Sequence, residues 1–172
     1  MTGSRRQTLR RALAGLAPAA AVAATLLAGG QSAAVTLAGR VTVIDGDTLE
    51  MRGERIRLFG IDAPESGQTC QTREGRAWRC GTEAARELDL LARGRTVTCE
   101  TRDTDRYGRT VAVCKVGGLD LGSALVAGGH AVAFRSYSKI YVPAEEAAKA
   151  AARGLWAGEF QMPSDWRKAR KP

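Results

Sequence analysis

Between Gly39 and Asp62, three short runs in which Val, Ile and Leu alternate with polar residues follow one another closely. The stretch reads GRVTVIDGDTLEMRGERIRLFGID. Alternation with a period of two places apolar side chains on one face of a β-strand. Asp45-Gly46-Asp47 and Arg52-Gly53 separate the runs, and these residue types suit tight turns. The sequence therefore predicts a meander of three short strands.

Three later segments show helical signals. In GTEAARELDLLARG, apolar residues recur at the spacing of one helix face, with Thr82 placed to cap the start and Gly94 to end it. Asp120 predicts the start of a short helix that runs through Val126 and stops at two glycines. VPAEEAAKAAARG has a proline suited to a first helical turn and closes on Gly154.

Two further strands, RTVTCE and RTVAVCKV, flank the loop TRDTDRYG between the first and second helices. The predicted order is three strands, a helix, two strands and two helices, and 172 residues allow one domain with a real core. Five short antiparallel strands with helices packed on one side predict an α+β, mainly β fold. The pattern fits a small closed barrel of the OB type, and it leaves a β-sandwich open.

The first 34 residues carry a different pattern. They begin with arginines, continue with an Ala- and Leu-rich run that is too weak and short for a membrane span, and end in small residues. This predicts an export signal over 1–34, cleaved after Ala34, in preference to a disordered basic terminus. SRRQTLR also resembles a twin-arginine signal, but Thr8 stands where a large apolar residue is usual, so the export route stays open.

Removal of that segment changes the argument from charge. It takes four of the 26 basic residues and none of the 18 acidic ones, which lowers the formal net charge from +8 to +4. A basic chain favours an anionic partner such as nucleic acid, and the smaller value weakens this inference.

Four cysteines remain after the predicted cleavage: Cys70, Cys80, Cys99 and Cys114. An even number in an exported chain predicts two disulfides, for which three pairings exist. We favour Cys70–Cys80, which would close a loop, and Cys99–Cys114, which would bridge neighbouring strands. A structural zinc site is the weaker alternative, because there is no CxxC pair and His130 is the single histidine. We interpret that histidine as structural.

Carboxylates gather at the ends of two predicted strands. Asp45 and Asp47 lie in a turn, while Asp62 and Glu65 follow the third strand. Each acid alone is an ordinary turn residue. If the strands are neighbours, the acids come together, and clustered carboxylates need a cation or an arginine. Oxygen ligands favour a hard cation such as Ca²⁺. Pro64 restricts the local backbone and so directs Glu65.

Two arginines accompany these acids. Arg57 lies five residues before Asp62 on the third strand, and Arg109 begins a later strand next to Tyr107. Taken alone, Arg57 would commonly be a surface residue paired with an acid. Two guanidinium groups, a metal ion and Glu65 together form a set that phosphodiester cleavage needs. The guanidinium forks bind phosphate oxygens, the metal neutralises developing charge, and the carboxylate positions or deprotonates water.

The motifs VIDGDT, RLFGIDAPE, DRYGR and RGLWAGEF, in this order and spacing, resemble the staphylococcal-nuclease-like (thermonuclease) family, in a disulfide-bearing exported bacterial subgroup. The resemblance covers residues 37–158. It implies an OB-type five-stranded antiparallel barrel with three helices over 35–158, followed by a basic C-terminal extension over 159–172. It also implies a Ca²⁺-dependent endonuclease that hydrolyses DNA and RNA, prefers single strands and leaves a 3′-phosphate. We expect a monomer, periplasmic or secreted, with no membrane anchor after signal cleavage.

The resemblance assigns the acidic residues one by one. Asp47 and Asp62 match the family's calcium carboxylates, and the Ala63 backbone carbonyl matches a further ligand. Asp45 matches an acid that shapes the site without necessarily touching the ion. Glu65 matches the residue that acts as general base or orients the attacking water.

The basic and aromatic positions follow in the same way. Arg57 and Arg109 match the phosphate-binding arginines that stabilise the five-coordinate transition state. Tyr107 matches an aromatic position beside the nucleotide, and Tyr137 is assigned to another. Phe134 stands near a position where many relatives carry tyrosine, which removes a hydroxyl contact and keeps a ring for base stacking.

Two other classes of function stay open. One is an OB module that binds nucleic acid or another polyanion without cleaving it, and the intact set of Arg57, Glu65 and Arg109 argues against it. The other is an envelope interaction protein that relies on its cysteine pairs and basic tail. Metal-dependent hydrolysis would separate a nuclease from both, and salt-sensitive binding without cleavage would favour the binding module.

Overall fold

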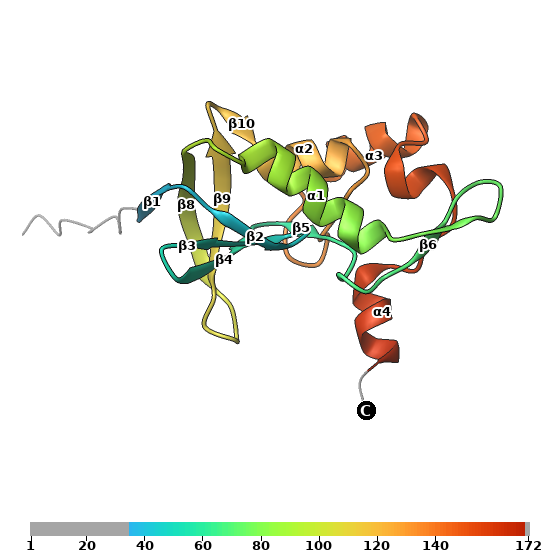
Figure 1. The fold of residues 1–172 in the computed structure, drawn as a ribbon, viewed down its shortest axis with the longest axis horizontal. Coiled ribbons are helices and arrows are strands. Elements are labelled where there is room, and N and C mark those ends of the chain that lie inside the picture. Colours follow the sequence, from blue (N-terminus) through green and yellow to red (C-terminus); the bar gives the residue numbers. More distant parts are fainter. Residues whose placement is uncertain (1–34, 171–172) are drawn as a thin grey trace, which may run out of the picture. The chain divides into compact units, whose positions relative to one another are not determined.

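The structure is a computed structural model that describes residues 35–170 (Figure 1). The predicted export signal over 1–34 lies outside the described residues. The strands are β1 Thr36–Gly39, β2 Thr42–Asp45, β3 Thr48–Met51, β4 Glu54–Leu58, β5 Ile61–Asp62, β6 Cys70–Gln71, β7 Ala77–Trp78, β8 Val97–Thr104, β9 Thr110–Val116, β10 Leu119–Asp120 and β11 Val132–Ala133. The helices are α1 Cys80–Ala92, α2 Leu121–Ala127, α3 Val142–Ala150, the 3₁₀ turn η1 Gly154–Ala157 and α4 Pro163–Ala169.

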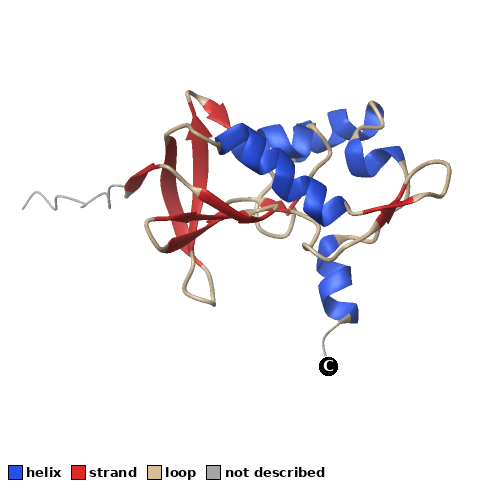
Figure 2. Ribbon diagram, viewed as in Figure 1, coloured by secondary structure: helices blue, strands red, loops and turns tan. Residues whose placement is uncertain are grey.

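The main sheet closes on itself in strand order. The order is β1, β8, β9, β4, β3, β2, with β10 beside β9. The first and last strands of this order, β1 and β2, are successive parts of the segment 36–45, so one continuous segment forms both ends of the sheet. Figure 2 shows this curled sheet with α1, α2 and α3 together beside it. The predicted mainly β, OB-type fold is confirmed.

One strand pair departs from the antiparallel prediction. β4 and β9 pair in parallel, with Arg57 opposite Val111, whereas the other neighbours in the main sheet are antiparallel. An all-antiparallel barrel is therefore wrong at this pair. Parallel strands need a long crossover connection, and α1 with β8 supplies one between β4 and β9.

The predicted meander is present as β2, β3 and β4. Thr48 of β3 lies opposite Arg57 of β4, and the register of β2 shifts between Val43 and Asp45. A bulge of this kind redirects the side chains that follow it. Leu49 and Ile56, which face each other across β3 and β4, are completely buried. Their burial anchors the strand that carries Arg57, with each such side chain contributing about 1.5–3 kcal/mol.

The start of α1 differs from the prediction. The helix begins at Cys80 rather than after Thr82, and its N-cap residue, Arg79, makes no side-chain cap bond. Cys80 is bonded to Cys70, which ties the helix start to β6. The disulfide therefore fixes a helix start that lies two residues before Thr82, the cap predicted from local sequence. Gly94, with φ of 73°, follows the helix end as expected.

The second and third predicted helices need smaller changes. Asp120 caps α2 by accepting a hydrogen bond from the Ser123 N–H at 3.0 Å, as the sequence indicated. Pro143 lies in the first turn of α3. That helix ends at Ala150, and Gly154 instead begins η1. At Gly154 a Cβ atom would lie 2.4 Å from the Gly129 carbonyl oxygen, so this glycine is needed for a close backbone crossing.

A further helix, α4, forms within the segment predicted as a basic extension. Within residues 35–170 it makes four α-helices where three were expected. Ahead of it, Gln71 and Glu159 pair through two backbone hydrogen bonds, and the Gln68 Nε2 amide donates to the Gln161 carbonyl at 2.7 Å. Figure 1 shows α4 standing apart from α1, α2 and α3. The tail is thus folded back onto the loop that follows β5.

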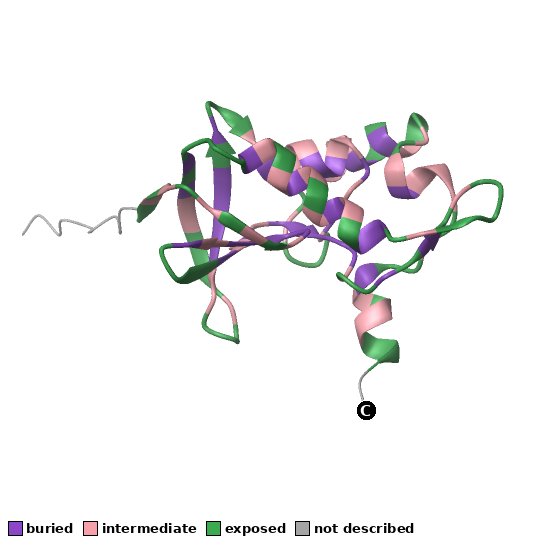
Figure 3. Cartoon of the chain, viewed as in Figure 1, coloured by how far each residue is buried: buried purple, intermediate pink, exposed green. Residues whose placement is uncertain are grey.

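Both disulfides join the pairs that we favoured from sequence. Cys70 is bonded to Cys80, with 5.7 Å between their Cα atoms, and Cys99 is bonded to Cys114 across β8 and β9. All four cysteines are buried. Figure 3 shows buried residues concentrated on β9 and on the faces of α1 and α2 that turn toward the sheet. Within residues 35–170, no helix has the length and apolar character needed to cross a membrane.

His130 predicts a pH dependence of stability. It lies after α2, its ring Nδ1 is buried without a hydrogen-bond partner among the described residues, and burial lowers its pKa. The folded state therefore disfavours the protonated ring. Stability should be complete above the unfolded pKa of about 6.5 and should fall as the pH drops below it.

Urea unfolding at about pH 7.5 and about pH 5 tests this dependence. Wild type should lose more free energy of unfolding between the two values than His130→Leu, since the variant has no ring to protonate. The comparison cancels contributions from the other titrating groups. Equal losses in the two proteins would contradict the assignment.

Candidate active site

Arg57 lies between two buried carboxylates that come from different elements. Its Nη1 donates to Asp47 Oδ1 at 2.7 Å, and its Nη2 donates to Asp62 Oδ1 at 3.2 Å. Asp47 follows β2, Arg57 is on β4 and Asp62 ends β5. The Asp47 and Asp62 side chains are 6% and 3% exposed. Buried charges are costly to desolvate, so each acid depends on its partner.

Asp47 is held by one hydrogen bond within the β2–β3 turn and one from the residue that follows β5. The Asp47 N–H donates to Asp45 Oδ1 at 3.0 Å, and the Ala63 N–H donates to Asp47 Oδ2 at 3.1 Å. At Gly46, a Cβ atom would lie 2.7 Å from the Ala63 Cβ and 2.8 Å from the Ala84 Cβ. Glycine is therefore required where the turn presses against β5 and α1.

The charge on Asp47 is incompletely balanced. Burial raises its pKa to about 7, and the neighbouring Asp45 and Asp62 carboxylates add to the rise. Arg57 and the Ala63 N–H oppose it. A carboxylate in this situation gains from any further positive charge placed beside it.

Arg167 of α4 supplies a second guanidinium that sequence reasoning missed. Its Nη1 and Nη2 donate to Asp62 Oδ1 and Oδ2 at 2.9 and 3.0 Å, and its Nη1 also donates to Glu65 Oε1 at 2.8 Å. Burial lowers the pKa of Arg167, but the bonds to the two acids outweigh it and raise the pKa overall. The side chain is therefore charged. Its only sequence signal is that it belongs to a basic tail.

The backbone of Glu65 is held in a tight loop. The Gln68 N–H donates to the Glu65 carbonyl at 2.7 Å, and the Glu65 N–H donates to Gln68 Oε1 at 3.3 Å. At Gly81, near the start of α1, a Cβ atom would lie 1.7 Å from the Glu65 carbonyl oxygen. The loop therefore rests on a helix position that only glycine allows. The Glu65 carboxylate itself is 40% exposed.

Arg109 and Tyr107 lie together in the β8–β9 loop. The Arg109 Nε donates to Asp105 Oδ2 at 2.7 Å, and the guanidinium carbon lies 5.5 Å from the centre of the Tyr107 ring. Although burial opposes it, hydrogen bonds from the Arg109 backbone and side chain hold the pKa of Asp105 below its usual value. Arg109 immediately precedes β9, the strand that pairs with the Arg57 strand, with Val111 opposite Arg57. The guanidinium groups of the two arginines bind different acids.

Aromatic rings gather beside this loop. The Tyr137 ring centre lies 5.4 Å from that of Phe59 and 6.1 Å from that of Phe134. The Tyr137 hydroxyl donates to Asp103, which raises its pKa to about 12. Because Asp103 is two residues before Asp105, the aromatic group and the Arg109 loop are joined. Tyr137 and Tyr107 are both exposed, as stacking on a base requires.

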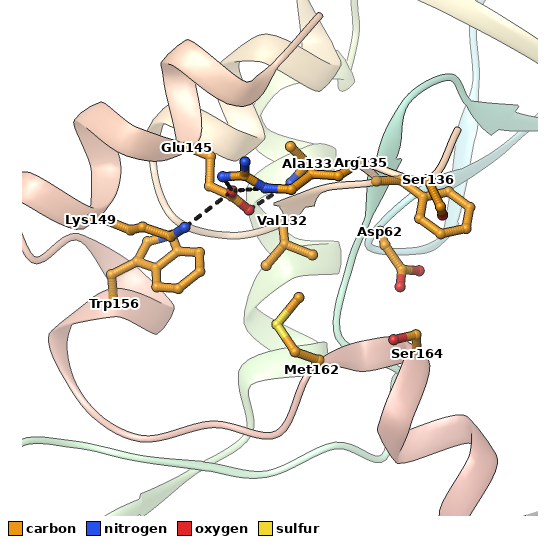
Figure 4. Close-up of a pocket in the computed structure, with 11 residues that line it drawn as sticks. Asp62, Val132, Ala133, Arg135, Ser136, Glu145, Lys149, Trp156, Met162 and Ser164 are labelled. Atoms are coloured by element: carbon orange, nitrogen blue, oxygen red, sulfur yellow. Dashed lines mark hydrogen bonds and ion pairs between the residues drawn. The ribbon is translucent and has the colours of Figure 1, made fainter. Parts of the chain in front are cut away.

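A cavity of about 410 Å³ adjoins Asp62. Figure 4 shows Glu145 at one side of it, joined to Arg135 and Lys149, and Asp62 at the other side. Glu145 is 1% exposed and also accepts a hydrogen bond from the Ala133 N–H at 3.0 Å, so α3 is tied to β11. The remaining lining residues are Val132, Ala133, Phe134, Ser136, Trp156, Met162 and Ser164.

The carboxylates suit a hard cation chemically. In the described part of the chain, no three His, Cys, Asp or Glu side chains are placed to hold a metal ion. Guanidinium groups of Arg57 and Arg167 lie against the oxygens instead. The donors are nonetheless all oxygen, as Ca²⁺ prefers. Asp47, Asp62 and Glu65 contact the two arginines, and Asp45 accepts a hydrogen bond from the Asp47 N–H.

Sequence comparison identifies the class to which this fold and site belong. Residues 55–158 match the family described as staphylococcal nuclease homologue. The chain is 39% identical over 143 residues to the succinoglycan biosynthesis protein ExoI of Rhizobium meliloti, covering 81% of this chain and 75% of the relative. It is 33% identical to an uncharacterized endonuclease of Haemophilus influenzae, covering 76% and 72%, and 33% identical to a micrococcal nuclease of Shigella flexneri, covering 76% and 80%. The protein belongs to the staphylococcal nuclease homologue family.

Proposed function

We propose that the protein is an exported, Ca²⁺-dependent endonuclease that hydrolyses phosphodiester bonds in DNA and RNA. The observation that carries the proposal is the Arg57 guanidinium held between Asp47 and Asp62, with Glu65 joined to Asp62 through a shared partner. Family membership and the nuclease names of two relatives support a phosphodiester hydrolase.

The acids would act as a cation site and a base. Asp47 and Asp62, with the Ala63 carbonyl, would hold the ion, and Asp45 would keep the turn in shape. A bound Ca²⁺ would supply positive charge to the phosphate oxygens. Glu65 would accept a proton from the attacking water or orient it, and its partial exposure leaves room for that water.

The basic and aromatic residues would hold the substrate. Arg57 and Arg109 would bind phosphate oxygens through their guanidinium forks and stabilise the charge that develops on them. Tyr107 and Tyr137 would stack on bases, which favours single strands because their bases are free to stack. Product would leave with a 3′-phosphate.

Two buried disulfides support an oxidising location, since such bonds persist outside the reducing cytosol. We therefore propose export to the periplasm or the medium, with cleavage after Ala34 and action as a monomer without a membrane anchor.

A cleavage assay tests the proposal. With Ca²⁺, the chain from Val35 onward should release fragments from single-stranded DNA and from RNA, and more slowly from duplex DNA. Excess chelator should abolish cleavage, because it removes the cation that would neutralise the charge on the phosphate. Gel analysis of labelled oligonucleotides across several divalent cations measures this. Unchanged cleavage in chelator would contradict the metal requirement. Salt-sensitive binding without cleavage would favour the binding module instead.

A further inference from the structure

Arg167 engages the same oxygens that the proposed cation needs. Its two terminal nitrogens bond both carboxylate oxygens of Asp62, and one of them also bonds Glu65. Asp62 Oδ1 additionally accepts from Arg57. A cation on Asp62 would thus meet oxygens that already accept hydrogen bonds and a positive guanidinium about 3 Å from them, and like charges at such short range repel.

The helix that carries Arg167 is suited to reversible docking. α4 has seven residues, of which only Pro163 is buried. Lys168 pairs with Asp165 inside the same helix, so it does not tie the helix to the barrel. The bond from Gln68 to the Gln161 carbonyl secures the segment just before the helix. Elements with so little buried apolar surface open at low free-energy cost.

We propose that Arg167 is a further residue of the active site, which holds Asp62 and Glu65 in the cation-free protein and competes with the divalent cation for them. The inference rests on the proposed function in placing the cation on Asp62. Linkage between two binding events is reciprocal. Arg167 therefore lowers the affinity for the cation, and the cation weakens the docking of α4. Until a cation binds, the arginine also bonds one oxygen of the carboxylate expected to act on water.

Calorimetric titration of Ca²⁺ into wild type, Arg167→Gln and Lys168→Gln tests the first consequence. Arg167→Gln should bind Ca²⁺ about 5- to 150-fold more tightly than wild type, which is the usual range of coupling between sites. Lys168→Gln is the matched control, because it removes one positive charge from the same helix without touching Asp62 or Glu65. It should bind as wild type does. Thermal unfolding of each protein shows that the fold is kept.

Hydrogen exchange tests the second consequence, that the cation weakens the docking of α4. Ca²⁺ should speed exchange of the amides in residues 164–169 of wild type, and in Arg167→Gln these amides should exchange quickly even without Ca²⁺.

The outcomes separate this inference from the proposed function. Equal or weaker Ca²⁺ binding by Arg167→Gln, or α4 exchange that Ca²⁺ does not change, would overturn the competition and leave the nuclease proposal standing. Absence of Ca²⁺ binding in wild type and Arg167→Gln would overturn both.

Discussion

Replacement of Glu65 by glutamine is expected to lower nuclease turnover by about 10²- to 10⁴-fold, the usual contribution of a general base. Glutamine keeps the size and shape of the side chain but accepts no proton. The carboxylate is 40% exposed and its partner Arg167 is 36% exposed, so the lost ion pair should change the free energy of unfolding by less than about 1 kcal/mol. Initial rates on saturating single-stranded DNA measure the effect on turnover.

Glu74→Gln is the control for this substitution. Glu74 is an exposed acid in the β6–β7 loop, where it pairs only with Arg76 among the described residues. Its replacement makes the same chemical change away from the Arg57 cluster and should leave turnover at the wild-type value. A Glu65→Gln enzyme that works within about twofold of wild type would remove Glu65 from the role of base.

Replacement of Gly81 by alanine is expected to destabilise the protein by about 1–3 kcal/mol or more, as overpacking does. In an ordinary helix interior, Gly→Ala raises the stability of the protein by up to about 1 kcal/mol. A loss of stability would therefore show that the space beside Gly81 is too small for a Cβ atom. Here the added Cβ would lie 1.7 Å from the Glu65 carbonyl oxygen. Relief of that clash moves the loop that carries Glu65. Turnover should therefore fall as well, since about 1 Å of misplacement costs about 10²-fold.

Gly67→Ala provides the comparison in the same loop. A Cβ atom at Gly67 would meet nothing within 4 Å, so its addition should leave stability and turnover near wild type. Urea unfolding and initial rates on the same preparations measure both quantities. A Gly81→Ala protein more stable than wild type would show that the helix start is free to shift away from Glu65.

Local pattern was sufficient for several elements of the fold. The meander follows from alternation of apolar residues and two turns, and α2 follows from Asp120, whose side chain caps the helix by accepting a hydrogen bond from the Ser123 N–H. The cluster of Asp47, Arg57 and Asp62 was also predictable. These residues lie within sixteen positions, in the turn after β2, on β4 and at the end of β5, so the short connections between these elements bring them together.

Other features were decided by contacts that no local pattern encodes. α1 begins before Thr82, since a disulfide and the packing of Gly81 against Glu65 hold the chain there. β4 and β9 pair in parallel because the intervening helix and strand bring the chain back in the same direction.

The sequence by itself determined the family, the mainly β class of the fold and the acids and arginines of the central motifs. Only the tertiary structure decided where the C-terminal segment lies. Arg167 reaches Asp62 across 105 positions of sequence, and its own helix shows no pattern that names a partner. A long-range ion pair depends on the direction in which folded elements present their charges. Composition and periodicity do not determine that direction. The contact of Arg167 with Asp62 and Glu65 could therefore be found only in the tertiary structure.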